Sequence, residues 1–231
     1  MYSLLLLAAL PGQFVENPQF PNARQQGAYE ATVRTYHPAS RSYGTAVAVA
    51  RRGPAVFFLT AAHLVPEKAV PGREKEDIKK VELYVYTAKS HPKLASLETA
   101  FVRARMPNED LAVLEAVLPD FAGVVPICPK GRFQLRLPMA VMTVGGSPDG
   151  PPEIQFDTVK EKKLLHKPDK TSALYWEADI PQQIGRSGGP MIDAQGHVVG
   201  IASGTWHGKG YYTYINEMYR ALANAGYAWL Y

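Results

Sequence analysis

Cysteine is almost missing from the sequence: Cys128 is the only one among 231 residues. An intramolecular disulfide is therefore excluded, and with it the disulfide-stapled class of secreted domains. Cys128 lies in the apolar, proline-bounded stretch Val124–Pro129, so we expect a buried, inert thiol rather than a catalytic one. The sequence also has no nucleotide-binding loop, no zinc-ligand spacing and no repeat, and we expect neither a metal nor a cofactor.

Long apolar runs are missing as well. The run Leu4–Leu10 is too short to cross a bilayer as a helix, so we expect no stable membrane span. It resembles the apolar core of a signal peptide, although no Lys or Arg precedes it and no clear small-x-small cleavage site follows. We read residues 1–27 as a candidate signal peptide and connector, and expect an exported protein (periplasm, envelope or secreted). The alternative is a cytoplasmic protein whose N-terminal tail packs on the domain.

The charge imbalance is small, with 25 Lys and Arg against 21 Asp and Glu. Most of the basic excess falls in residues 73–80 and 160–170, where acidic residues are interspersed, which indicates solvated loops or exposed strands. A nucleic-acid surface needs clustered basic side chains with stacking aromatics, and no such module is present. We therefore expect no nucleic-acid partner. Apolar residues make up 46% of the chain, a normal value for a folded globular protein.

Turn-forming residues are abundant, with 19 Gly and 19 Pro, as in β-rich folds with short strands. In the first half, alternating or apolar segments predict six strands, enough to close a small barrel: Ala28–Tyr36, Gly44–Ala50, Ala55–Leu59, Val81–Thr87, Thr99–Arg105 and Leu111–Val117. The second half repeats the pattern in Phe133–Val144, Glu153–Val159 with a continuation to Leu165, Ala173–Ala178, Met191–Asp193, His197–Ser203 and Tyr211–Tyr214. Apolar residues at helical spacing over 215–224 predict a closing helix.

The most informative stretch is Gly185-Arg186-Ser187-Gly188-Gly189-Pro190. Glycine permits backbone conformations closed to other residues, and proline ends regular structure. A tight turn of this kind can aim backbone N–H groups into one small space and leave the Ser187 hydroxyl at its rim, which is how an oxyanion hole beside a nucleophile is built. The alternative for this hexamer alone is a glycine-rich surface turn between two strands.

Two upstream residues supply partners for Ser187. His63 ends the apolar run Phe57–His63, and Asp110 opens another apolar run. A serine hydroxyl needs a base to become a good nucleophile, imidazole suits that role near neutral pH, and a carboxylate on its other nitrogen fixes the tautomer. Singly, a histidine after an apolar strand is more often packing, and Asp110 could be a strand-edge charge, with Glu109 and Asp120 as competitors.

Together, the blocks Thr60-Ala61-Ala62-His63, Asp110-Leu111-Ala112 and Gly185–Pro190 resemble the signatures of trypsin-like serine peptidases, in the chain order His, Asp, Ser. Asp179 fits the bacterial branch related to DegP-type proteases. The resemblance implies an all-β, chymotrypsin-like fold of two six-stranded antiparallel barrels with a C-terminal α-helix. We expect lobes at residues 28–118 and 133–231, joined by a crossing at 119–132.

The resemblance also implies a serine endopeptidase with the triad His63, Asp110 and Ser187, and an oxyanion hole made by the N–H groups of Gly185 and Ser187. Its substrate is a peptide or protein. Residues implied to bind that substrate are Pro181, Gln182, Ile184, Ser203, Gly204 and Thr205. None of the pocket residues is an acid, so a preference for Lys or Arg is not supported, and we expect a small or medium apolar side chain at P1.

One departure from the family concerns activation of the enzyme. Arg186 stands where the digestive enzymes carry an aspartate that pairs with a newly cut N-terminus, and a cation cannot form that ion pair. We therefore expect no activation by cleavage of that type, and expect Arg186 to face an acid elsewhere or solvent. Two other functions stay open: a silent peptide-binding pseudoprotease, and a serine esterase.

Overall fold

The computed structural model describes residues 23–87, 92–147, 150–166 and 171–231. The apolar run Leu4–Leu10 lies outside these residues, so the predicted export signal stays a prediction. The first half contains α1 (Ala23–Glu30), β1 (Thr32–His37), β2 (Ser42–Arg52), β3 (Ala55–Thr60), the 3₁₀ turn η1 (Ala62–Leu64), β4 (Lys80–Tyr86), β5 (Leu94–Met106) and β6 (Leu111–Val117). The second half contains β7 (Met139–Gly146), β8 (Pro152–His166), β9 (Ser172–Ala178), β10 (Pro190–Ile192), β11 (Val198–Trp206), β12 (Lys209–Thr213), α2 (Ile215–Asn224) and η2 (Ala228–Leu230).

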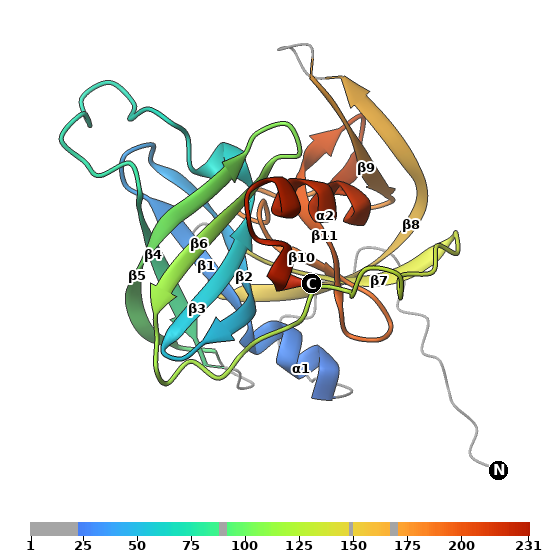
Figure 1. Ribbon diagram of the computed structural model, residues 1–231, viewed down its shortest axis with the longest axis horizontal. Helices are drawn as coiled ribbons and strands as arrows, with labels where there is room; N and C mark the ends of the chain where they lie inside the picture. Colours follow the sequence, from blue (N-terminus) through green and yellow to red (C-terminus); the bar gives the residue numbers. More distant parts are fainter. Residues whose placement is uncertain (1–22, 88–91, 148–149, 167–170) are drawn as a thin grey trace.

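The twelve strands of the described residues form two closed antiparallel barrels that lie side by side (Figure 1). The first has the strand order β1-β2-β3-β6-β5-β4 and the second β10-β11-β12-β9-β8-β7. Closing each sheet on itself leaves no unpaired edge along most of its length. The predicted all-β, double-barrel, chymotrypsin-like fold is confirmed.

Each barrel is filled by inward side chains from alternate strand positions. Phe58, Leu83 and Leu114 are fully buried in the first barrel, and each such side chain stabilises the fold by about 1.5–3 kcal/mol. In the second barrel Trp176 is fully buried and its indole N–H donates to the Val199 carbonyl at 2.8 Å. That bond satisfies the indole's donor inside the apolar core.

Antiparallel pairing brings distant parts of the sequence to common strand ends. Thr60 at the end of β3 pairs with Ala112 at the start of β6, so the chain leaving β3 meets the chain entering β6. In the second barrel Pro190 at the start of β10 pairs with Ile201 of β11. The turn before β10 therefore lies beside the segment that follows Ile201.

The predicted closing helix is confirmed as α2, which lies across the second barrel (Figure 1). Its side chains at the predicted helical spacing are buried, including Ile215, Met218 and Leu222. Such a stripe is what an amphipathic helix buries against a core. No helix among the described residues is long and apolar enough to cross a membrane.

Several predicted strand boundaries differ from the structure, and two of the differences have a clear physical reason. Ala28–Glu30 is the last turn of α1, not the start of a strand: Ala28 and Tyr29 are buried from a helix, and the Thr32 hydroxyl donates to the Ala28 carbonyl at 2.7 Å. Strand β7 begins at Met139 rather than Phe133, directly after Pro138. Proline has no N–H to give to a ladder, which explains this start.

Candidate active site

His63 and Asp110 form a hydrogen-bonded pair at the ends of β3 and β6. His63 lies in η1 and faces Asp110, which immediately precedes β6. The ring Nδ1 of His63 lies 2.8 Å from Asp110 Oδ2, and the backbone N–H of His63 donates to Oδ1 at 2.9 Å. The carboxylate thus fixes the ring from behind, while the His63 side chain stays 45% exposed. An imidazole oriented in this way can exchange protons through its outer nitrogen.

Asp110 occupies a strained and enclosed position. Its φ of 54° places it in the left-handed region, which aspartate tolerates better than most residues. Its side chain is only 9% exposed, and the Ser203 hydroxyl also donates to Oδ2. Burial alone would raise the pKa of Asp110, but the hydrogen bonds and charge of His63 and the bond from Ser203 outweigh it and hold that pKa below its ordinary value. Asp110 is therefore a carboxylate at neutral pH.

The turn that carries Ser187 has to be built from glycine. Gly185 and Gly188 have φ of 90° and 84°, in the region that favours glycine. A Cβ on Gly188 would lie 2.1 Å from the Thr45 carbonyl oxygen and 2.3 Å from Thr60 Oγ1. No side chain fits there, so this turn packs directly against the strand end that leads to His63.

Hydrogen bonds fasten the Ser187 turn to both barrels. The Thr45 N–H donates to the Ser187 carbonyl at 2.8 Å from β2 of the first barrel. In the second barrel the Gly188 N–H donates to the Ala202 carbonyl at 2.7 Å, and the Ala202 N–H donates to the Gly189 carbonyl at 2.8 Å. Ala202 precedes Ser203, the residue bonded to Asp110. His63, Asp110, Ser187 and Ser203 thus belong to one connected region between the barrels.

Within the described part of the chain no hydrogen bond joins the Ser187 hydroxyl to the His63 ring. Catalytic hydrogen bonds are often long or poorly aligned before substrate binds.

The same turn leaves two backbone donors without an acceptor among the described residues. Arg186 donates its N–H to the Gln183 carbonyl at 3.1 Å and Gly189 to the Arg186 carbonyl at 3.0 Å, whereas the N–H groups of Gly185 and Ser187 have no such partner there.

The six residues expected to bind substrate lie near this turn and along β11. Gln182, Ser203 and Gly204 are half-buried, and Pro181, Ile184 and Thr205 are exposed, Ile184 to 84%. The Thr205 hydroxyl donates to the Gln182 carbonyl at 2.9 Å, which ties the two segments together. The pairing of β11 with β12 shifts between Ala202 and Gly204, so Ser203 is a bulge residue. The bulge explains how its side chain reaches Asp110.

Arg186 does not reach solvent and forms no ion pair with an acid among the described residues, so that expectation is wrong. Only 3% of the residue is exposed, and its guanidinium donates to the Gly145 carbonyl at 3.2 Å and to Thr143 Oγ1 at 3.0 Å, with longer contacts to other carbonyls of β7 and β8. Burial lowers the pKa of Arg186, yet a guanidinium remains charged at neutral pH. Carbonyl dipoles inside the barrel, rather than a carboxylate, hold this cation.

Thr45 and the Asp110 contact of Ser203 are the features that sequence reasoning missed. The signal for Thr45 is a hydroxyl residue inside the buried strand 44–50, which must find a partner there.

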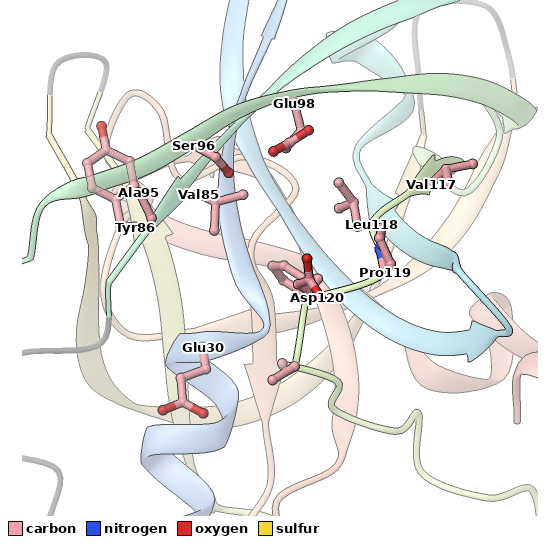
Figure 2. Close-up of a pocket in the computed structure, with 13 residues that line it drawn as sticks. Glu30, Val85, Tyr86, Ala95, Ser96, Glu98, Val117, Leu118, Pro119 and Asp120 are labelled. Atoms are coloured by element: carbon pink, nitrogen blue, oxygen red, sulfur yellow. The ribbon is translucent and has the colours of Figure 1, made fainter.

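A pocket of about 400 Å³ lies away from His63, at the opposite end of β6 from Asp110. Figure 2 shows that its lining comes from α1, β4, β5 and the segment after β6, including Glu30, Glu98 and Asp120. It is not part of the region around His63.

Comparison with solved structures shows which fold this is. The active form of the Rv3671c protease from M. tuberculosis matches with a TM-score of 0.67 and 20% identity over 89% of this chain and 85% of that chain. The serine endoprotease from Yersinia pestis matches with 0.63 and 16% over 89% and 67%. The HtrA-type protease AlgW with tripeptide matches with 0.64 and 17% over 89% and 65%. At these identities the likeness shows a shared fold.

Comparison of sequences shows the family to which the chain belongs. No curated protein sequence is significantly similar to the chain. The model of the trypsin-like peptidase domain family matches residues 44–201, which is more than half of the chain and includes His63, Asp110 and Ser187. By that match the chain belongs to the trypsin-like peptidase family, and it is a serine endopeptidase.

Proposed function

We propose that the chain hydrolyses peptide bonds through an acyl-enzyme formed on Ser187, with His63 and Asp110 as its catalytic partners. One observation carries the proposal. The His63 ring is held by Asp110 at 2.8 Å, and the turn of Ser187 packs, without room for a Cβ at Gly188, against Thr60 and Ala61 just before His63. A nucleophile and a base held on adjoining backbone are what acyl transfer requires.

In the proposed reaction, His63 carries out each proton transfer. His63 takes the Ser187 hydroxyl proton as the oxygen attacks the peptide carbonyl, and the resulting imidazolium is stabilised by the Asp110 carboxylate. His63 then gives that proton to the leaving amine, and the acyl-enzyme remains. Water enters, loses a proton to His63 and attacks the ester, after which Ser187 recovers its proton and the acid product leaves.

The negative oxygen of each tetrahedral intermediate needs donors. The backbone N–H groups of Gly185 and Ser187 are the proposed pair, and their lack of acceptors among the described residues supports that role. Fixed donors of this kind need no reorganisation during reaction, and loss of one costs about 10²–10³ in rate.

Substrate binding is proposed along β11. Its residues 204–206 pair with β12 on one side, while pairing with β10 ends at Ile201. The backbone edge at Gly204 and Thr205 is therefore open to an added substrate strand. Pro181, Gln182 and Ile184 are proposed to line the P1 pocket with Thr205, and since none carries a charge, the proposed P1 residue is a small or medium apolar one.

Two other functions use the same fold. A pseudoprotease would bind peptides without cleaving them, and a serine esterase would use the same nucleophile on other acyl groups. The connected region of His63, Asp110 and the glycine turn favours turnover, because a scaffold does not need a buried carboxylate oriented on an exposed imidazole.

The test is hydrolysis of a peptide library with varied P1 residues, alongside simple p-nitrophenyl esters, by the wild type, Ser187→Ala and Asp110→Asn. We expect peptide cleavage, abolished in Ser187→Ala and reduced by about 10⁴ in Asp110→Asn. Ester cleavage with intact peptides would identify an esterase. Absence of both activities in folded wild-type protein would identify a scaffold, and either outcome overturns the proposal.

A further inference from the structure

A second cluster of reactive side chains lies at the other end of β10 from Ser187. It consists of Cys128, Asp193 and His197, whose Sγ, carboxylate oxygen and imidazole nitrogen lie within 4.8 Å of one another. Cys128 is buried and the other two are partly buried. Peptide hydrolysis as proposed above makes no use of these three residues.

Backbone contacts hold the cluster together. The Cys128 N–H donates to the Val198 carbonyl at 3.0 Å, and the Val198 N–H donates to the Pro126 carbonyl at 2.9 Å. This ladder fixes Cys128, from the crossing between the barrels, beside the start of β11. The approach of Cys128 to His197 is therefore set by main-chain bonds.

The hairpin between β10 and β11 orients the carboxylate. Asp193 Oδ1 accepts the N–H groups of Gln195 at 2.9 Å and His197 at 2.8 Å, which closes the turn. The other oxygen, Oδ2, faces His197 Nδ1 at 3.6 Å. One carboxylate oxygen thus has a structural role, and the second is directed toward the cluster.

The 3.6 Å between Asp193 Oδ2 and His197 Nδ1 is too long for a direct hydrogen bond and suits a shared ion. His197 Nδ1 is a buried atom without a hydrogen-bond partner among the described residues. Two ligands each about 2.1 Å from a tetrahedral Zn²⁺ lie about 3.4 Å apart, close to the 3.6 Å between Asp193 Oδ2 and His197 Nδ1. A buried imidazole nitrogen needs some partner, and a metal ion would provide one.

We propose that Cys128, Asp193 and His197 bind Zn²⁺. A thiolate and an imidazole favour zinc over Mg²⁺ or Ca²⁺, which prefer oxygen ligands alone. Three protein ligands leave a fourth position for water. On binding, the Cys128 thiol gives its proton to solvent and its sulfur donates an electron pair to the ion, with no change of oxidation state.

The bound ion would join the crossing segment to the β10–β11 hairpin. Asp193 follows β10 and Ser187 precedes it, so the ion lies outside the proposed peptide site and acts on stability rather than on the reaction. The sequence gives little sign of this site, because Cys128 stands 65 residues before Asp193 and no ligand-pair spacing includes it. Only the barrel topology brings the three together.

Co²⁺ offers a direct test on metal-free full-length protein. A cobalt–thiolate bond produces an intense near-ultraviolet charge-transfer band, and Cys128 is the only cysteine in the chain, so the band identifies its ligand. We expect the band to appear on adding Co²⁺ and to vanish on adding Zn²⁺. Zinc at about 100 times its Kd should also raise the Tm by about 5 °C or more. No charge-transfer band at millimolar Co²⁺ would overturn the proposal.

Substitutions test which side chains bind the zinc. His63→Gln removes the other imidazole–carboxylate pair of the described residues, and His166→Gln is a matched control for an exposed histidine. We expect both to keep one equivalent of zinc binding, and Cys128→Ser and His197→Gln to weaken it by at least about tenfold. Zinc binding that persists in both ligand variants, or is lost only in His63→Gln, would overturn the proposal. Neither result bears on peptide hydrolysis.

Discussion

The Thr45 backbone N–H donates to the Ser187 carbonyl at 2.8 Å, from a strand of one barrel to the nucleophile turn of the other. The Thr45 hydroxyl also donates to the Gly185 carbonyl at 2.7 Å and accepts the Gly146 N–H at 3.0 Å. Thr45 therefore holds both ends of the tripeptide that supplies the proposed oxyanion donors. It is a positioning residue, since its contacts are with the turn rather than with substrate.

Replacing Thr45 with valine keeps the shape and removes the hydroxyl. The Gly185 carbonyl and Gly146 N–H would then be buried without this partner, at about 1–3 kcal/mol of unfolding free energy. Because the Gly185 peptide unit is also released, we expect kcat to fall by about tenfold or more while KM changes little. Thr45→Ser retains the hydroxyl and should keep kcat. Equal kcat values for the two variants would remove Thr45 from the positioning role.

Gly188→Ala tests the packing of the turn against β3. The added methyl would lie 2.1 Å from the Thr45 carbonyl oxygen, at a φ of 84° that alanine avoids. We expect a loss of more than about 3 kcal/mol in denaturant unfolding. Gly27→Ala is the control, because nothing lies within 4 Å and the residue is in α1, where alanine should stabilise by about 0.5–1 kcal/mol. Similar effects of the two substitutions would contradict the packing described.

Sequence reasoning identified the fold and the three signature blocks because both depend on local pattern. Strand alternation, apolar runs and a glycine-rich turn can be read without knowing what packs on them. Arg186 and Ser203 could not be assigned in this way, because their side-chain directions depend on the barrel interior and on the bulge in β11. Helix α1 was missed because Ala28 and Tyr29 fit an alternating strand equally well.

Ser203→Ala removes the hydroxyl bonded to Asp110. The pKa of Asp110 should rise, because one of the interactions that lower it is lost. We expect the titration of the Asp110 carboxyl group to move to higher pH, and kcat/KM to fall by about 10–100-fold, as for a hydrogen bond to a charged group. Ser172→Ala is the control and should behave as wild type, because Ser172 lies at the exposed start of β9 with its hydroxyl 2.7 Å from His166 Nδ1. A fall in kcat/KM without a rise in the pKa of Asp110 would indicate a packing role instead.

Asp157 makes stability depend on pH. It is buried, and burial, with the nearby charge of Asp179, outweighs its backbone hydrogen bonds and raises its pKa from 3.8 to about 6. The folded protein therefore holds this proton more tightly than the unfolded chain. The associated stability is complete below about pH 4 and is lost as pH rises through about 6.

Asp157→Asn imitates the protonated acid at every pH. The unfolding free energy of the wild type, measured relative to this variant, should fall by about 2–3 kcal/mol between pH 4 and pH 7. Urea denaturation at several pH values gives this difference, in which the other carboxylates cancel. A difference that stays constant or rises with pH would contradict the burial of an ionisable Asp157.

The most direct measurement is mass spectrometry of the protein after reaction with a fluorophosphonate, which labels only an activated serine. The proposed site predicts one adduct, mapped by peptide sequencing to Ser187, formed rapidly in the wild type and very slowly in His63→Gln. An unlabelled wild type, a label on another residue, or a rate independent of His63 would contradict the account.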